Sequence, residues 1–173
     1  MDRRLKRVLS ARVRLFVAAA AVTGLSTVNA ALAASKTFIG TASHDWTNDT
    51  NWSPVGVPVA TDDVAINAGK TADLSNTDAA INNLTLAGGT LTGTGTLTVN
   101  GTLTWSGGTM SGSGKTVAGG GLALNGSGTK TLNRTLSNTG AATWTDTGNI
   151  TIGTGGVLSN EPGASFTVLA ALR

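Results

Sequence analysis

The chain has 173 residues, with 12 Lys+Arg, 9 Asp+Glu, one His, no Cys and 24 Gly. The lack of cysteine excludes disulfides, thiolate metal sites and a cysteine nucleophile. Six basic residues against one acidic residue lie in the first fourteen positions, whereas the rest of the chain has six basic against eight acidic residues. The folded part therefore lacks the basic excess of a nucleic-acid-binding domain, and we expect no nucleic-acid partner.

The first 33 residues predict a cleaved signal peptide. An apolar run of 11 residues, Leu15 to Leu25, follows the basic stretch and precedes the small residues Ala31-Leu32-Ala33. The run is too short to span a bilayer, which takes about 20 apolar residues. We expect cleavage after Ala33, membrane contact only during export, and a mature protein that is secreted or at the cell surface.

The mature chain is expected to have a capping segment, residues 34–62, and a repeat region, residues 63–173. Apolar residues return about every 20 positions in three interleaved series, and such a period is typical of a solenoid. The first series is Val64/Ile66, Leu84/Leu86, Leu103/Trp105, Leu122/Leu124, Ala142/Trp144 and, at a looser step, Phe166/Val168; the second is Leu97, Val117, Leu136 and Val157; the third is Leu91, Met110, Leu132 and Ile152.

Each pair in the first series flanks a small residue, which is the alternation of a strand with one buried side. Glycine and asparagine pairs lie between the strands and suit corners. Because the period has three phases, we expect an all-β fold, a three-faced parallel β-helix of about five coils, rather than a meander of hairpins. The absence of a strict six-residue repeat favours a right-handed coil. The expected core contains Leu86, Leu103, Trp105, Leu122, Leu124 and Trp144.

The segment from Trp46 to Ser53, with Gly56, Pro58 and Asp62 to Ile66 after it, resembles the opening region of bacterial exported β-helical surface proteins. These are similar to autotransporter passenger domains and repeat-rich adhesins, and the resemblance covers residues 42–168. It implies an adhesin-like protein, associated with the outer membrane if it is autotransporter-like. Because an autotransporter carries a C-terminal barrel and this sequence stops at Arg173, the resemblance implies a truncated member, a passenger fragment or a small secreted relative.

Two groups of polar residues are candidates for chemistry. His44 is the one histidine, and a surface role is favoured over catalysis because its neighbours in sequence supply no relay. Asp45, Asp49, Asp62 and Asp63 are a weak Ca²⁺ candidate because carboxylates are hard oxygen ligands. Solvated turn carboxylates are the favoured interpretation, with Asp62 capping the turn into the first coil. No cofactor is expected.

The four tryptophans divide into two pairs. Trp105 and Trp144 have the phase of the core and should point inward, with Leu124 between them. Trp46 and Trp52 are expected to plug the N-terminal end of the rod, and a glycan-stacking role is the alternative for this pair.

Two classes of function remain. The first is a noncatalytic exported structural or adhesin-like rod that contacts glycans, host molecules or neighbouring cells. The second is a β-helical polysaccharide lyase or hydrolase fragment, which needs clustered carboxylates or a basic residue in a groove. The first is favoured, with no catalytic residue, because the coils from Leu84 to Ser159 contain only Lys115, Lys130, Arg134 and Asp146 as charged candidates.

The surface suggests two further expectations. The outward series Ala65, Thr85, Thr104, Ala123 and Thr143 is interrupted twice, which disfavours an ice-binding plane. The apolar residues Leu169 to Leu172 follow the last coil, and a strand edge with little charge invites pairing with another chain. Self-association through the C-terminal coil is therefore predicted, and a native chain that continues past Arg173 is the alternative.

Overall fold

The computed structural model describes residues 33–75 and 77–169. The predicted signal peptide thus lies, except for its last residue, outside the described residues. Within the described ranges no helix has the length and apolarity to cross a bilayer.

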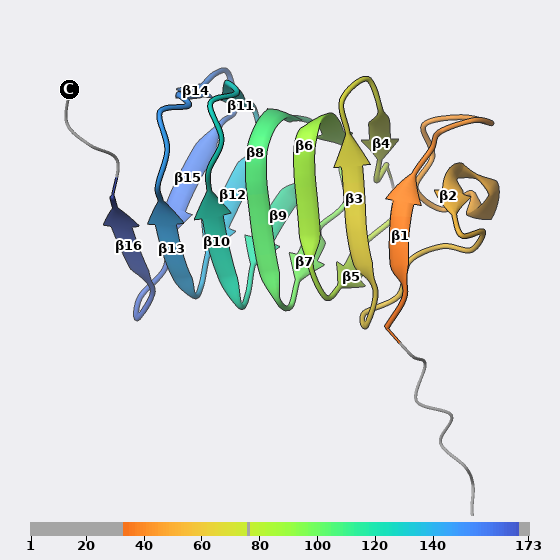
Figure 1. Ribbon diagram of the computed structural model, residues 1–173, viewed down its shortest axis with the longest axis horizontal. Helices are drawn as coiled ribbons and strands as arrows, with labels where there is room; N and C mark the ends of the chain where they lie inside the picture. Colours follow the sequence, from red (N-terminus) through yellow and green to blue (C-terminus); the bar gives the residue numbers. More distant parts are fainter. Residues whose placement is uncertain (1–32, 76, 170–173) are drawn as a thin grey trace, which may run out of the picture. The chain divides into compact units, whose positions relative to one another are not determined.

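The strands wind into a three-faced parallel β-solenoid (Figure 1). Face 1 contains β1 (Ser35–Phe38), β3 (Asp63–Asn67), the first halves of β6 (Leu84–Thr92) and β8 (Thr102–Met110), β10 (Gly121–Leu124), β13 (Ala141–Trp144) and β16 (Ser165–Val168). Face 2 contains β4 (Thr71–Asp73), the second halves of β6 and β8, β11 (Lys130–Leu132) and β14 (Ile150–Ile152). Face 3 contains β5 (Ala79–Ile81), β7 (Leu97–Val99), β9 (Lys115–Ala118), β12 (Thr135–Asn138) and β15 (Val157–Asn160).

Faces 1 and 2, together with β2 (Trp52–Ser53) at the N-terminal edge, form one 11-stranded sheet, because β6 and β8 each run through the corner between the two faces without a break in strand structure. Face 3 is a separate 5-stranded sheet. Starting from β3, the three faces are visited five times before β16 begins a further rung, which confirms the five expected coils. Figure 1 shows the chain rising along the near face, crossing at the top to the more distant strands of face 3, and advancing leftward, which is a right-handed coil.

The register confirms two of the three predicted series. On face 1, Leu84 pairs with Leu103 and Leu103 with Leu122, and the looser step to Phe166 is also correct because Ala142 pairs with Phe166. On face 2, Met110 lies between Leu91 and Leu132. The apolar residues of these rungs fill the interior as one core.

The second series is wrong by one residue at two places. Leu97 pairs with Thr116, not with Val117, and Leu136 pairs with Leu158, not with Val157. Leu97 lies six positions after Leu91, and Thr116 lies six positions after Met110, so the corner has equal length in both coils and places the threonine inside. The apolar character of Val117 therefore predicted the wrong side chain to face the core. Thr116 takes its place, buried between Leu97 and Leu136.

Stacking also begins earlier than the predicted boundary at residue 63. Strand β1 pairs in parallel with β3, and Asp45 forms a parallel bridge with Asp73 of β4. Residues 35–46 are therefore a partial coil beneath the first complete one. The rest of the capping segment folds back over the end through the short 3₁₀ helix η1 (Asp49–Asn51) and β2 (Trp52–Ser53), which pairs antiparallel with β1.

Candidate functional site

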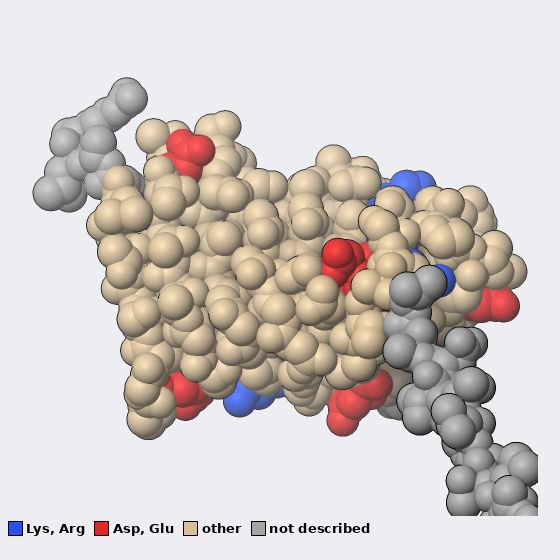
Figure 2. Space-filling view, turned by 60° about the horizontal axis from the view of Figure 1, so that its bottom comes forward, with Lys and Arg blue, Asp and Glu red and all other residues tan. Residues whose placement is uncertain are grey.

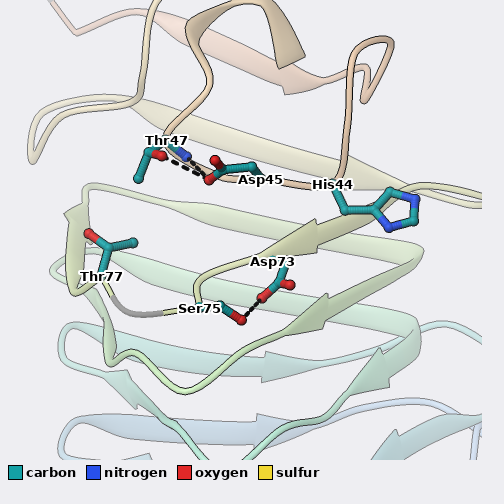
Figure 3. Close-up of a pocket in the computed structure, with 6 residues that line it drawn as sticks. All are labelled: His44, Asp45, Thr47, Asp73, Ser75 and Thr77. Carbon is teal, nitrogen blue, oxygen red and sulfur yellow. Dashed lines mark hydrogen bonds between the residues drawn. The ribbon is translucent and has the colours of Figure 1, made fainter.

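A polar pocket of about 550 Å³ lies at the N-terminal end of face 2 and the corner that follows it. It is lined by His44, Asp45, Thr47, Asp73, Ser75 and Thr77 (Figure 3). The capping segment supplies the first three residues, and β4 with its following corner supplies the others. The two segments are held together because Asp73 donates its N–H to His44 O at 2.8 Å and Trp46 donates to Asp73 O at 2.9 Å.

Each carboxylate of the pocket holds a neighbouring hydroxyl. Asp45 Oδ1 accepts from both the backbone N–H and the hydroxyl of Thr47, each at 2.8 Å. Asp73 Oδ1 accepts from Ser75 Oγ at 2.6 Å. Figure 3 shows the His44 ring turned away from Asp73 and Ser75, so these three side chains form no nucleophilic relay. The pocket instead offers hydroxyls and carboxylate oxygens, the groups that hydrogen-bond a polyhydroxylated ligand.

The four aspartates of the calcium candidate do not converge. Asp49 lies in η1, whereas Asp62 is buried and accepts from Ala34 N–H and Val59 N–H, both at 3.0 Å. Asp63 Oδ1 accepts from the amides of Asn82 and Asn83 at 2.8 and 2.7 Å. Across the described ranges no three His, Cys, Asp or Glu residues gather around a common point. The capping role expected of Asp62 is confirmed, and the four residues serve separate turns.

Trp46 and Trp52 are buried, with exposed fractions of 1 % and 0 %. Their ring centroids lie 4.7 Å apart at 73°, and Trp52 packs edge-on against Phe38 at 5.0 Å. The indole N–H of Trp52 donates to Trp46 O at 2.8 Å. Glycan stacking through this pair is therefore wrong for this structure, because a sugar needs an exposed ring face. The favoured interpretation, an aromatic plug at the N-terminal end, is confirmed.

The other two tryptophans occupy the predicted column. Leu124 pairs with Trp105 on one side and with Trp144 on the other, and Val168 follows Trp144. Trp105 is fully buried and Trp144 is half-buried, because fewer residues cover the last coil. The remaining predicted core residues, Leu86, Leu103, Leu122 and Leu124, are all buried.

Two cations of the coils, Lys130 and Arg134, lie inside the solenoid, which excludes them from a surface groove. Lys130 is 0 % exposed and donates to the carbonyls of Gly126 and Gly128 at 3.3 and 3.2 Å. Burial lowers the pKa of Lys130 below its ordinary value, and the carboxylate of Asp146 partly opposes this shift. Both side chains are buried, a position that the sequence pattern does not indicate for a charged residue.

Arg134 joins three successive coils. Its Nη2 donates to Gly95 O at 2.8 Å and to Lys115 O at 2.9 Å, and its Nη1 donates to Ser111 O at 3.3 Å. Burial lowers the pKa of Arg134 to about 10. A column of glycines at this corner makes room for the guanidinium, since a Cβ on Gly114 would lie 2.6 Å from Nη2. In the sequence, the burial of Arg134 is indicated only by Gly95 and Gly114, which occupy the same corner in the two preceding coils. This alignment can be recognised only once the register of the coils is known.

Face 2 carries an outward column of threonine in every coil. Thr71, Thr90, Thr109, Thr131 and Thr151 pair in succession without interruption. The next outward column begins with Asp73 and Thr92, so it does not consist of threonine alone. Face 2 therefore lacks the Thr-x-Thr plane of an ice-binding surface. Asp73 lies on β4 two residues after Thr71, the first threonine of the column, and it also lines the pocket. The threonine column and the pocket therefore form one polar strip, here called the face 2 strip. On the side of the solenoid that Figure 2 shows, charged side chains are sparse.

These features define the class: a right-handed parallel β-solenoid with an aromatic plug at its N-terminal end and a hydroxyl-rich face. No family model, curated protein or solved structure matches the chain. The fold thus stands on the geometry of the coils, and the resemblance to exported surface proteins stays a prediction from the sequence.

Proposed function

We propose that this protein is an exported, noncatalytic, adhesin-like β-helical rod whose face 2 strip contacts a neutral glycan on another surface. The observation that carries the proposal is the unbroken threonine column joined to the polar pocket at its base. Stacked coils hold these hydroxyls at a repeat of about 4.8 Å on a stiff sheet, so little conformational entropy is lost on binding.

The small number of charged side chains on the face 2 strip supports an uncharged polysaccharide as the partner. No charged side chain belongs to the threonine column, and the carboxylates at its base are Asp45 and Asp73. An acidic polysaccharide would be repelled by these two groups, whereas a neutral sugar can donate its hydroxyls to them. Weak individual hydrogen bonds would add up along a polymer that follows the strip.

A glycan array probed with labelled protein spanning residues 34–173 tests this function. We expect binding to neutral polysaccharides that is reduced at least tenfold by Thr109→Tyr, which places a bulky ring in the middle of the strip. Thr104→Tyr is the matched control, since Thr104 lies on the same strand, β8, but points outward from face 1. Equal binding by both variants, or no binding at all, would refute a contact through this strip.

The same polysaccharides distinguish the enzymatic alternative. Incubation followed by analysis of reducing ends and unsaturated products should show no turnover. Depolymerisation that Asp73→Asn abolishes would replace the adhesin-like function with that of a polysaccharide lyase or hydrolase, because Asp45 and Asp73 both line the pocket and form a backbone bridge.

Export is tested separately. Expression of all 173 residues in a Gram-negative host, with fractionation and N-terminal sequencing, should give an exported protein that starts at Ala34. Retention of an uncleaved chain in the cytoplasm would contradict the signal-peptide prediction and leave the glycan measurement unaffected.

A further inference from the structure

The last coil exposes residues that belong to the interior. Ile152 pairs with the buried Leu132 of the preceding coil. Val168 pairs with Trp144, which in turn pairs with the buried Leu124. Both residues therefore continue columns of the core. Nevertheless Ile152 is 54 % exposed and Val168 is 58 % exposed, because no described residue packs over them. The core thus ends in an open apolar layer at this end of the solenoid.

Strand edges surround this layer. Within residues 33–75 and 77–169, β14, β15 and β16 each have a neighbouring strand on one side only. None of the three contains a charged residue, and residues 147–160 contain none at all. Unpaired edges that lack charge are templates for another strand, and here no like charges would oppose a second copy of the same edge.

The opposite end differs. Trp46, Trp52 and Phe38 close its apolar layer, and β2 pairs with β1, which leaves β5 of face 3 as an edge strand there. Head-to-tail stacking, which would continue into a fibre, is therefore blocked at one of its two surfaces. Since the open end combines an apolar layer with strand edges on all three faces, its matching surface is a second open end, and this gives a closed two-fold pair.

We propose that the open end, formed by β14, β15 and β16, is the interface of a two-fold homodimer. Along the coil, β15 lies one third of a turn beyond β14, and β16 lies a further third of a turn beyond β15. The three edge strands therefore stand at successively greater heights along the solenoid axis. A two-fold axis through the middle of face 3 matches these heights: β15 meets β15 of its copy, and β16 meets β14. Rotation about such an axis reverses strand direction, so the pairs are antiparallel.

Sedimentation equilibrium on the protein spanning residues 34–173 tests the dimer. We expect twice the monomer mass for the unsubstituted chain and the monomer mass for the double variant Ile152→Lys/Val168→Lys, which puts four charges into the interface. Val55→Lys/Val59→Lys is the matched control, because both residues are exposed apolar groups of the capping segment, at 68 % and 49 %. This control should remain a dimer, and far-UV circular dichroism should be equal for all three proteins.

A cysteine placed on β15 tests the geometry, because the chain has no cysteine of its own. Oxidised Ser159→Cys should form a covalent dimer, whereas Val55→Cys at the capped end should not. A monomeric unsubstituted chain, extended polymers, or a dimer unaffected by the lysines at Ile152 and Val168 would each overturn the proposal. A monomer would indicate that another segment of the same polypeptide covers these strand edges instead.

Discussion

At the scale of single residues, the interior of this solenoid is not purely apolar. Arg134 is 1 % exposed, and Thr116 is 0 % exposed. The guanidinium donates to three backbone carbonyls of the two preceding coils, whereas the hydroxyl of Thr116 finds no partner among the described residues. The two residues should therefore respond to substitution with opposite signs.

Replacing Arg134 with alanine should destabilise the fold by about 3 kcal/mol, because the variant leaves buried carbonyls without donors and creates a cavity. Urea unfolding followed by circular dichroism measures this change. Lys115→Ala serves as the control, since Lys115 is exposed at the neighbouring position and its loss should cost less than about 0.5 kcal/mol. Equal effects of the two variants would show that Arg134 does not hold the coils together.

Thr116→Val should stabilise the protein by about 1 kcal/mol, because a methyl group replaces a buried hydroxyl that makes no hydrogen bond. The same unfolding experiment measures the gain. The control is Thr131→Val on the outward side of face 2, where the change should stay within about 0.5 kcal/mol. A loss of stability in Thr116→Val would mean that this hydroxyl does have a partner.

At the scale of the elements, corners and cross-coil contacts decide how the strands stack. Gly88 and Gly108 have φ of 83° and 93° at the corner between faces 1 and 2, a conformation that glycine adopts without a steric penalty. At the corner after face 3, Asn138 Nδ2 donates to Asn160 Oδ1 at 2.8 Å between successive coils. Glu161 adds a further link by accepting from Ser137 of β12.

Gly108→Ala should cost more than about 2 kcal/mol, whereas Gly107→Ala should change stability by only a few tenths of a kcal/mol. A Cβ on Gly108 would lie 2.2 Å from Gly89 O and would also meet the left-handed backbone penalty. On Gly107, whose φ lies outside the left-handed region, the nearest atom is 3.5 Å away. Thermal unfolding of these adjacent variants makes the comparison, and similar melting temperatures would contradict the tight corner within β8.

The contribution of Glu161 should depend on pH. Hydrogen bonds from Ser137 and Ser159, with a smaller effect of Lys115, hold the pKa of Glu161 below its ordinary value of 4.5. Because the folded-state pKa is depressed, the stabilisation is complete above the unfolded-state pKa and is lost as pH falls through the folded-state pKa. Unfolding from about pH 7 down to about pH 3 should show this acid-dependent loss in the unsubstituted protein and a smaller loss in Glu161→Gln; parallel curves would refute it.

At the scale of the whole molecule, stability should be uneven along the rod. In a solenoid each coil is stabilised mainly by its neighbours, so an end coil with one neighbour is weaker unless it is capped. The aromatic plug covers the N-terminal end, while Trp144, Ile150, Leu158 and Phe166 near the other end are only partly buried.

Hydrogen exchange measured by mass spectrometry should detect this asymmetry. In the monomeric Ile152→Lys/Val168→Lys variant, amides of β15 should exchange at least tenfold faster than amides of β7 on the same face, because local opening of the last coil disrupts few contacts. In the unsubstituted protein, protection of β15 should rise with protein concentration. Equal protection of β7 and β15 in the lysine variant would show that the last coil needs no cover.

Sequence alone determined the architecture, because apolar residues at a 20-residue period in three phases, with glycine-rich corners between them, favour a coil in which like residues stack over a meander of hairpins. The columns through Leu103, Leu124 and Met110 follow directly from that spacing. The tertiary structure decided what depends on register and on the ends: the inward turn of Thr116, the threonine column of face 2, and the burial of Arg134 over Gly114. It also brought Asp45 beside Asp73 and buried Trp46 against Trp52. These contacts join residues from different coils or from the irregular capping segment, where a difference of one residue in a corner reverses which side chains face the core.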